Sequence, residues 1–157
     1  MICLLRVDDK LLHGQVAFSW VKNLRIHTII IADDEVVYDG FMKMTLGLSK
    51  PSEVHLEIVE VSKAIELIRQ HIHSDLNVMI VVKNIENAYR ILEKVPQIQS
   101  LNLGSLRTRY GVKQITENIA LNDKELQLCQ KLINHGTNIE IRMCYHDKKQ
   151  DFGDFFK

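Results

Sequence analysis

The sequence predicts a single α/β domain over residues 1–157, with three layers (α/β/α) and a mostly parallel central sheet. Two observations lead to this expectation. Short apolar runs alternate with segments of helical periodicity along the whole chain, and no Gly-, Pro- or Ser-rich linker divides it. Such alternation is typical of repeated strand–helix units, which form parallel sheets covered on both faces. It leaves open an antiparallel arrangement of the late strands at the sheet edge.

Strands are expected where apolar or β-branched residues run together without helical spacing. Residues 78–82 are apolar throughout, as in a strand buried on both faces, whereas residues 114–121 alternate like a strand near an edge. In chain order, the expected strands lie at residues 2–7, 28–32, 56–61, 78–82, 101–103, 114–121 and 139–143.

Helices are expected where apolar residues recur every three or four positions. Asp33 and Asp34 are the expected caps of the second helix, whose apolar stripe includes Phe41, Met44 and Leu48. The polar and aromatic tail, residues 145–157, carries no clear element. The expected helices lie at residues 16–24, 37–48, 61–72, 85–92 and 126–133.

Composition excludes several classes of function. Lys+Arg and Asp+Glu are both 20, so no global basic field favours nucleic acid or membrane lipid, and no nucleic-acid partner is expected. The apolar runs are too short to span a membrane, and no signal peptide is expected. Cys3, Cys129 and Cys144 are widely spaced, which favours free thiols in a reducing compartment.

His13 is the most informative residue, because it follows the first expected strand and precedes Gly14 and an amphipathic helix. Ligands of open α/β sheets bind at the carboxyl ends of strands. The first N–H groups of the helix are free to hold an anion, and Gly14 lets the backbone approach it closely. His13 is therefore a candidate nucleophile toward phosphorus, with Asp8 or Asp9 to hold its other ring nitrogen.

Other motifs carry weaker signals. His71 and His73 form one pair of ligand residues, and Cys144 and His146 form another. Neither has the second pair at fixed spacing that a zinc site needs, so no metal is expected. No glycine-rich dinucleotide motif or P-loop is present, so no nucleotide cofactor is expected.

The segment 6–16, RVDDKLLHGQV, resembles the phosphohistidine loop of a bacterial family. This family comprises the IIB components of the mannose/fructose/sorbose branch of the phosphoenolpyruvate-dependent sugar phosphotransferase system. The resemblance covers almost the whole chain up to Met143, and its further motifs lie at residues 29–35, 81–84, 102–104, 111–116 and 142–143.

The resemblance implies an enzyme, a protein-phosphohistidine–sugar phosphotransferase without a cofactor. His13 would accept a phosphoryl group on Nδ1 from a IIA protein and pass it to a sugar entering through the membrane components IIC and IID. Asp8 would orient His13, and Arg107 and Arg109 would meet the partner or the phosphoryl group. The expected phosphate-binding residues are Lys10, Gly14, Gln15, Arg6, Gly104 and Ser105.

The resemblance also implies a cytoplasmic protein that associates with the inner face of the membrane through IIC and IID. It leaves open a homodimer, and it leaves open mannose, fructose, sorbose and amino sugars as substrates. Lys10 stands where relatives usually carry arginine, and Ser105 where they often carry a second glycine. These departures keep a second reading open, a non-catalytic, phosphorylation-responsive binding module. A third, a receiver with a phosphoaspartate, lacks an acid at a convincing third-strand end.

Overall fold

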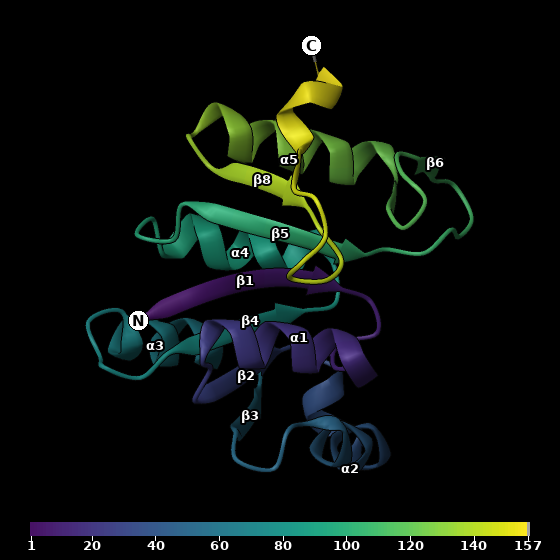
Figure 1. Ribbon diagram of the computed structural model, residues 1–157. Coiled ribbons are helices and arrows are strands. Elements are labelled where there is room, and N and C mark those ends of the chain that lie inside the picture. The colour runs from purple at the N-terminus through teal and green to yellow at the C-terminus, as the bar shows by residue number, and fades with distance from the viewer. Residues whose placement is uncertain (157) are drawn as a thin grey trace.

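The structure is a computed structural model, and it describes residues 1–156. A seven-stranded sheet runs through its centre, and every neighbouring pair is parallel except the last, β8–β9 (Figure 1). The expected mostly parallel sheet with an antiparallel edge is thus confirmed. In spatial order the strands are β3 (His55–Val59), β2 (Thr28–Ala32), β4 (Val78–Val82), β1 (Ile2–Asp8), β5 (Ser100–Ser105), β8 (Asn138–Ile141) and β9 (Gln150–Asp151).

Helices cover both faces of this sheet (Figure 1). Two of them pack on one face, and three pack on the other. The first group is α1 (Gly14–Leu24) and α2 (Gly40–Ser49), and the second is α3 (Val61–His71), α4 (Ile85–Lys94) and α5 (Asp123–Asn134). Two short 3₁₀ helices complete the fold, η1 (Val36–Tyr38) and η2 (Phe152–Phe156).

The two helical layers create two hydrophobic cores, because successive side chains of a strand point to opposite faces. In β4, Ile80 and Val82 lie in the core beneath α3, α4 and α5, whereas Met79 and Val81 lie in the core beneath α1. The strand is buried on both faces, which explains why its sequence is apolar without alternation.

The prediction of the second helix is wrong at the N-terminal end of the helix. Asp33 and Asp34 do not cap it, because Asp33 accepts bonds from the Glu35 and Val36 amides and Asp34 accepts one from the Val61 amide. The chain forms η1 instead, and α2 begins after Asp39, whose carboxylate accepts the Met42 amide at 3.0 Å. The helix is therefore shorter than the sequence pattern predicts.

The expected strand at residues 114–121 is a small hairpin, made of β6 (Lys113–Gln114) and β7 (Ala120–Leu121). The tail is ordered by β9 and by η2, whose Phe152 is fully buried. Lys157, which ends the expected domain and tail, lies outside the described residues. In the part described, no helix is long and apolar enough to cross a membrane.

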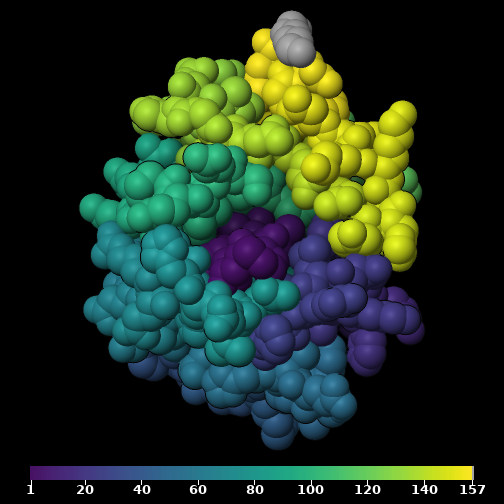
Figure 2. Space-filling model, turned by 60° about the vertical axis from the view of Figure 1, so that its left-hand side comes forward, coloured from purple at the N-terminus to yellow at the C-terminus, as the bar shows by residue number. Residues whose placement is uncertain are grey.

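The segment after β8 returns across the molecule to α1. Figure 2 shows the yellow C-terminal residues beside the blue-violet segment of α1, with the N-terminal residues enclosed between distant parts of the chain. The Trp20 indole donates to the Met143 carbonyl at 2.9 Å, and the Tyr145 amide donates to the Ser19 hydroxyl. These bonds join two segments more than a hundred residues apart, close to the end of β1.

Candidate functional site: the carboxyl end of β1

The loop between β1 and α1 leaves the sheet where its topology changes direction. From β1 the chain passes through α1 to β2 on one side, and from the neighbouring β4 it passes through α4 to β5 on the other. The helices leave on opposite faces, so their N-termini flank a crevice at the carboxyl ends of β1 and β4. His13 lies at the start of α1, in this crevice.

The loop is held by backbone bonds and by apolar anchors. The Leu11 amide donates to the Asp8 carbonyl at 2.9 Å, and Leu11 has a left-handed φ of 59°. Leu11 and Leu12 are buried in the core beneath α1. Gly14 follows with a φ of 44°, a conformation that favours glycine, so the loop turns into the helix with His13 at the N-cap.

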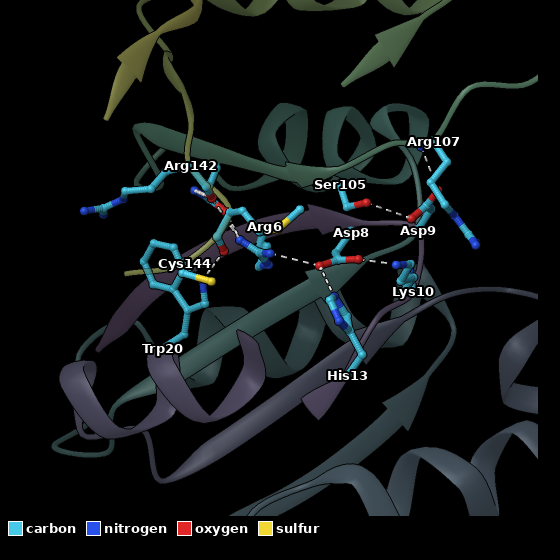
Figure 3. A network of polar contacts seen from close by, with 12 residues as sticks. Arg6, Asp8, Asp9, Lys10, His13, Trp20, Ser105, Arg107, Arg142 and Cys144 are labelled. Carbon is cyan, nitrogen blue, oxygen red and sulfur yellow. Dashed lines mark hydrogen bonds and ion pairs between the residues drawn. The ribbon is translucent and has the colours of Figure 1, made fainter. Parts of the chain in front are cut away.

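Asp8 is the centre of the site. It is fully buried, and its carboxylate accepts three hydrogen bonds: from Arg6 Nη2, from the Lys10 amide and from His13 Nε2, each at 2.9 Å (Figure 3). An ionised carboxylate can only accept, so the proton of a neutral His13 sits on Nε2. This leaves the lone pair on Nδ1. Of the two acids that the sequence offered as partners of His13, the structure brings Asp8 to the ring.

Arg6 lies behind Asp8 and is also buried. Its Nη1 donates to the Asn102 side chain at 2.7 Å and to the Arg142 carbonyl at 3.1 Å. Burial lowers the pKa of Arg6, and the adjacent Asp8 carboxylate opposes that shift. Gly104 packs against the guanidinium, and a Cβ at that position would overlap it. Gly104 therefore makes room for Arg6.

A further layer braces Arg6. The guanidinium of Arg142 lies 4.7 Å from the centre of the Trp20 ring, and that of Arg6 lies 5.5 Å from it. Arg142 also reaches Glu140, with Nη2 3.5 Å from Oε1, and donates to the Tyr145 carbonyl. The indole of α1 thus stacks with the two arginines, and this fixes α1 and His13 relative to β1 and β8.

Asp9 points to the other side of the loop, toward the segment after β5. It accepts from Ser105 Oγ at 3.3 Å and from both the amide and Nε of Arg107, at 2.9 and 3.0 Å. Arg109 lies farther along this segment, where it pairs with Glu125 at the start of α5. The structure therefore brings Arg107 to the β1–α1 loop, while Arg109 is held by another helix.

The remaining predicted site residues fall into two groups. Lys10, Gly14 and Gln15 are exposed on the loop and the first turn of α1, around His13. Ser105 is buried, like Arg6 and Gly104. Within residues 1–156 there is no cluster of three or more His, Cys, Asp or Glu side chains that suits a metal ion.

Fold and site together define an open α/β protein with a histidine fixed by a buried carboxylate at the switch point of its sheet, next to a helix N-terminus. Such a place suits an anion or a transferable acidic group. The family model of the sorbose-subfamily IIB components of the phosphotransferase system (PTS) matches residues 2–157. The chain belongs to this family, which confirms the resemblance to the IIB components.

Individual relatives agree with this assignment. The mannose-specific EIIAB component of Escherichia coli is 32% identical over 149 residues, which are 95% of this chain and 46% of that protein. This chain thus spans about half the length of that relative. The fructose-specific EIIB component of Bacillus subtilis is 26% identical and is matched over 93% of its length. The crystal structure of the sorbose permease IIB domain from Klebsiella pneumoniae, 28% identical, superimposes with a TM-score of 0.92 and covers 99% of this chain and 96% of its own.

The sequence alone does not reveal the side chains that surround Arg6 behind Asp8. Trp20 reads as an ordinary core residue of an amphipathic helix, and Glu140 as a polar position of the last strand. Arg142 belongs to a motif of the resemblance, and this was the one available signal that it has a role near the site. Its position beside Arg6 depends on the return of the chain after β8, which no local pattern predicts.

Proposed function

We propose that residues 1–157 form a cytoplasmic IIB domain that carries a phosphoryl group on His13. The group would come from a phosphohistidine of a IIA protein or domain and pass to a sugar that enters through the membrane components IIC and IID. The observation that carries this proposal is the bond between the buried Asp8 carboxylate and His13 Nε2, which leaves Nδ1 available at the open edge of the sheet.

The chemistry follows from this tautomer. The Nδ1 lone pair attacks phosphorus, an N–P bond to His13 forms, and the N–P bond to the donor imidazole breaks with its electron pair. The phosphorylated ring keeps its Nε2 proton and gains positive charge, which the Asp8 carboxylate stabilises. In the second half-reaction a sugar hydroxyl oxygen bonds to phosphorus, its proton is released, and the bond to Nδ1 breaks. His13 then regains its lone pair.

The phosphoryl oxygens are assigned to the exposed rim of the site. Gln15 and Gly14 present the N–H groups of the first turn of α1, and Lys10 supplies a positive charge from the loop. Arg6 is already bonded to Asp8 and is buried. We therefore assign Arg6 a positioning role through Asp8, together with Gly104, which admits its guanidinium.

Ser105 is assigned to the support of the loop, because its hydroxyl donates to Asp9 and its carbonyl accepts the Asp9 amide. Arg107 and Lys10 form the basic side of the site toward the IIA partner, with Arg109 behind them. Such charge raises the rate of encounter more than the final affinity. Added salt should slow phosphoryl transfer from IIA, and an Arg107→Ala/Arg109→Ala variant should lose much of this sensitivity.

The test is labelling from phosphoenolpyruvate through the general PTS proteins and a phosphorylated IIA. We expect one acid-labile phosphoryl group per chain, and none in the His13→Ala variant. His55→Ala is the matched control, because His55 is an exposed histidine paired with Glu57 on the edge strand β3. Full labelling of the His13→Ala variant would contradict the assignment. Labelling of the parent without any transfer to sugar would favour the non-catalytic binding module.

A further inference from the structure

Helix α2 carries apolar side chains that the fold leaves in solvent. Tyr38, Phe41, Met44 and Leu48 are 77%, 75%, 58% and 82% exposed, and we refer to these four as the α2 surface. Residues 41, 44 and 48 share one stripe of the helix, because they are three and four positions apart. Leu46, on the opposite side, anchors α2 in the core beneath α1.

The α2 surface is comparable in size to the largest apolar patch of an ordinary monomer, about 300–600 Å², and such patches are often functional. Scattered exposed apolar residues are normal, whereas these four lie along one element. Two aromatic rings alone, each of about 150–250 Å² and here three-quarters exposed, contribute roughly 200–400 Å². The α2 surface therefore has the size and composition of the apolar centre of a protein interface.

The α2 surface begins at the same edge of the sheet as His13. The chain leaves the carboxyl end of β2 and passes directly through η1 into α2. The Tyr38 hydroxyl contacts Glu60, which follows the carboxyl end of β3 and precedes α3. Figure 1 shows α2 at the β3 end of the sheet, whereas the segment that carries Arg107 follows β5 on the other side of β1. His13 thus lies between two flanks.

The two flanks differ in charge. Residues 33–60, which contain α2, hold seven acids and two lysines. Asp33 is buried and Asp34 pairs with Arg90, so the exposed acidic excess is smaller than this count. Glu35 and Asp39 are exposed at the starts of η1 and α2, at the same edge of the sheet as His13. The flank after β5 carries Arg107 and Arg109 instead. A partner that binds the α2 surface must therefore combine apolar residues with surrounding basic ones.

This chemistry fits one of the partners of the proposed function, on which this inference rests. Cytoplasmic loops of integral membrane proteins are enriched in Lys and Arg. The acidic flank would repel an anionic lipid surface, and it would also repel the acidic flank of a second copy of this chain. We propose that the α2 surface docks the basic, apolar cytoplasmic face of the sugar-transporting membrane component, while the basic flank serves IIA.

Docking is tested with the full chain and inverted membrane vesicles that carry the cognate IIC and IID components. The test variant is Phe41→Gln/Leu48→Gln, because glutamine is a good helix former and both positions are exposed. The control variant is Leu76→Gln, at an apolar position that is 44% exposed outside α2. The baseline is binding to vesicles that lack IIC and IID, and to protein-free anionic vesicles.

We expect the parent and the control variant to bind the IIC/IID vesicles alike, and the α2 variant to bind at least about tenfold more weakly. All three proteins should accept phosphate from IIA on His13 at the same rate. Parent-like vesicle binding by the α2 variant would overturn the proposal. So would parent binding to protein-free vesicles, loss of transfer from IIA in the α2 variant, or a parent dimer that this variant abolishes.

A charge test is independent of the apolar residues. Glu35→Lys should weaken binding to the same vesicles, and the loss should shrink as salt is added. Equal or tighter binding by this variant would refute the basic character of the partner. Failure of the proposed function itself has a different signature, because His13 of the parent would then take no phosphate from IIA whatever the vesicles show.

Discussion

Replacement of Asp8 by asparagine tests the buried charge network most sharply. The change keeps the size of the side chain and one oxygen for the Lys10 amide, but it removes the negative charge next to Arg6. Arg6 is only 2% exposed, so its charge stays buried without an ionic partner. Breaking a buried pair in this way costs about 3–5 kcal/mol in the free energy of unfolding.

The measurement is urea unfolding at neutral pH, followed by circular dichroism. With a urea m-value of about 2 kcal/mol/M, the midpoint should fall by roughly 1.5–2.5 M while m stays unchanged. Asp9→Asn is the matched control. Its ion pair is with Arg107, which is 63% exposed, and such a pair contributes only about 0–1 kcal/mol. Similar losses in the two variants would show that the buried charge of Arg6 is not what destabilises the Asp8→Asn variant.

If the Asp8→Asn variant does not fold, the double variant Arg6→Met/Asp8→Asn keeps the test available. Removing both charges leaves no uncompensated ion in the core, so much of the lost stability should return. A double variant no more stable than Asp8→Asn alone would show that the charge of Arg6 is not the cause.

Three further predictions concern separate features. Gly104→Ala should destabilise the protein by about 1–3 kcal/mol, because its Cβ overlaps the guanidinium of Arg6. Gly47→Ala, in open space on α2, should stabilise it by up to about 1 kcal/mol. The urea midpoints of the two variants should therefore shift in opposite directions from that of the parent. Burial raises the pKa of Cys129 from 9.0 to about 12, so at pH 9 its thiol should resist alkylation until urea unfolds the chain, as mass spectrometry of trapped peptides would show. Lys10→Arg should keep or improve transfer from IIA and Lys10→Glu should slow it strongly at unchanged stability; equal rates would mean that Lys10 points away from the phosphoryl group.

Much of the fold can be predicted from the sequence, because the burial of strands and helix faces determines the spacing of the apolar residues. Strands covered on both faces read as apolar runs, as in residues 78–82, and helices read as stripes. The region of α2 shows where this fails. Asp33 and Asp34 look like helix caps, but they bond other backbone amides, one of them at the distant Val61. Helical periodicity also does not show whether other elements cover the apolar stripe of a helix, and the apolar stripe of α2 is exposed to solvent.

The site could also be predicted only in part from the sequence. His13 and Gly14 follow from local order along the chain, because a strand, a short loop and a helix place them at the sheet edge. The choice between Asp8 and Asp9 depends on which way each carboxylate points at the end of β1, and spacing does not settle this. The braces of Arg6 come from Asn102 and Arg142, about 100 residues or more away, so only the fold brings them together.

Asp8 holds the Nε2 proton of His13, and we therefore expect Nδ1 to carry the phosphoryl group. Nuclear magnetic resonance of the ¹⁵N-labelled protein, phosphorylated through IIA, tests it most directly, because coupling to ³¹P identifies the bonded nitrogen and the ring-proton correlations identify the other. We expect phosphorus on Nδ1 of His13 and a proton on Nε2 that still bonds Asp8. Phosphorus on Nε2, or on any other residue, would contradict it.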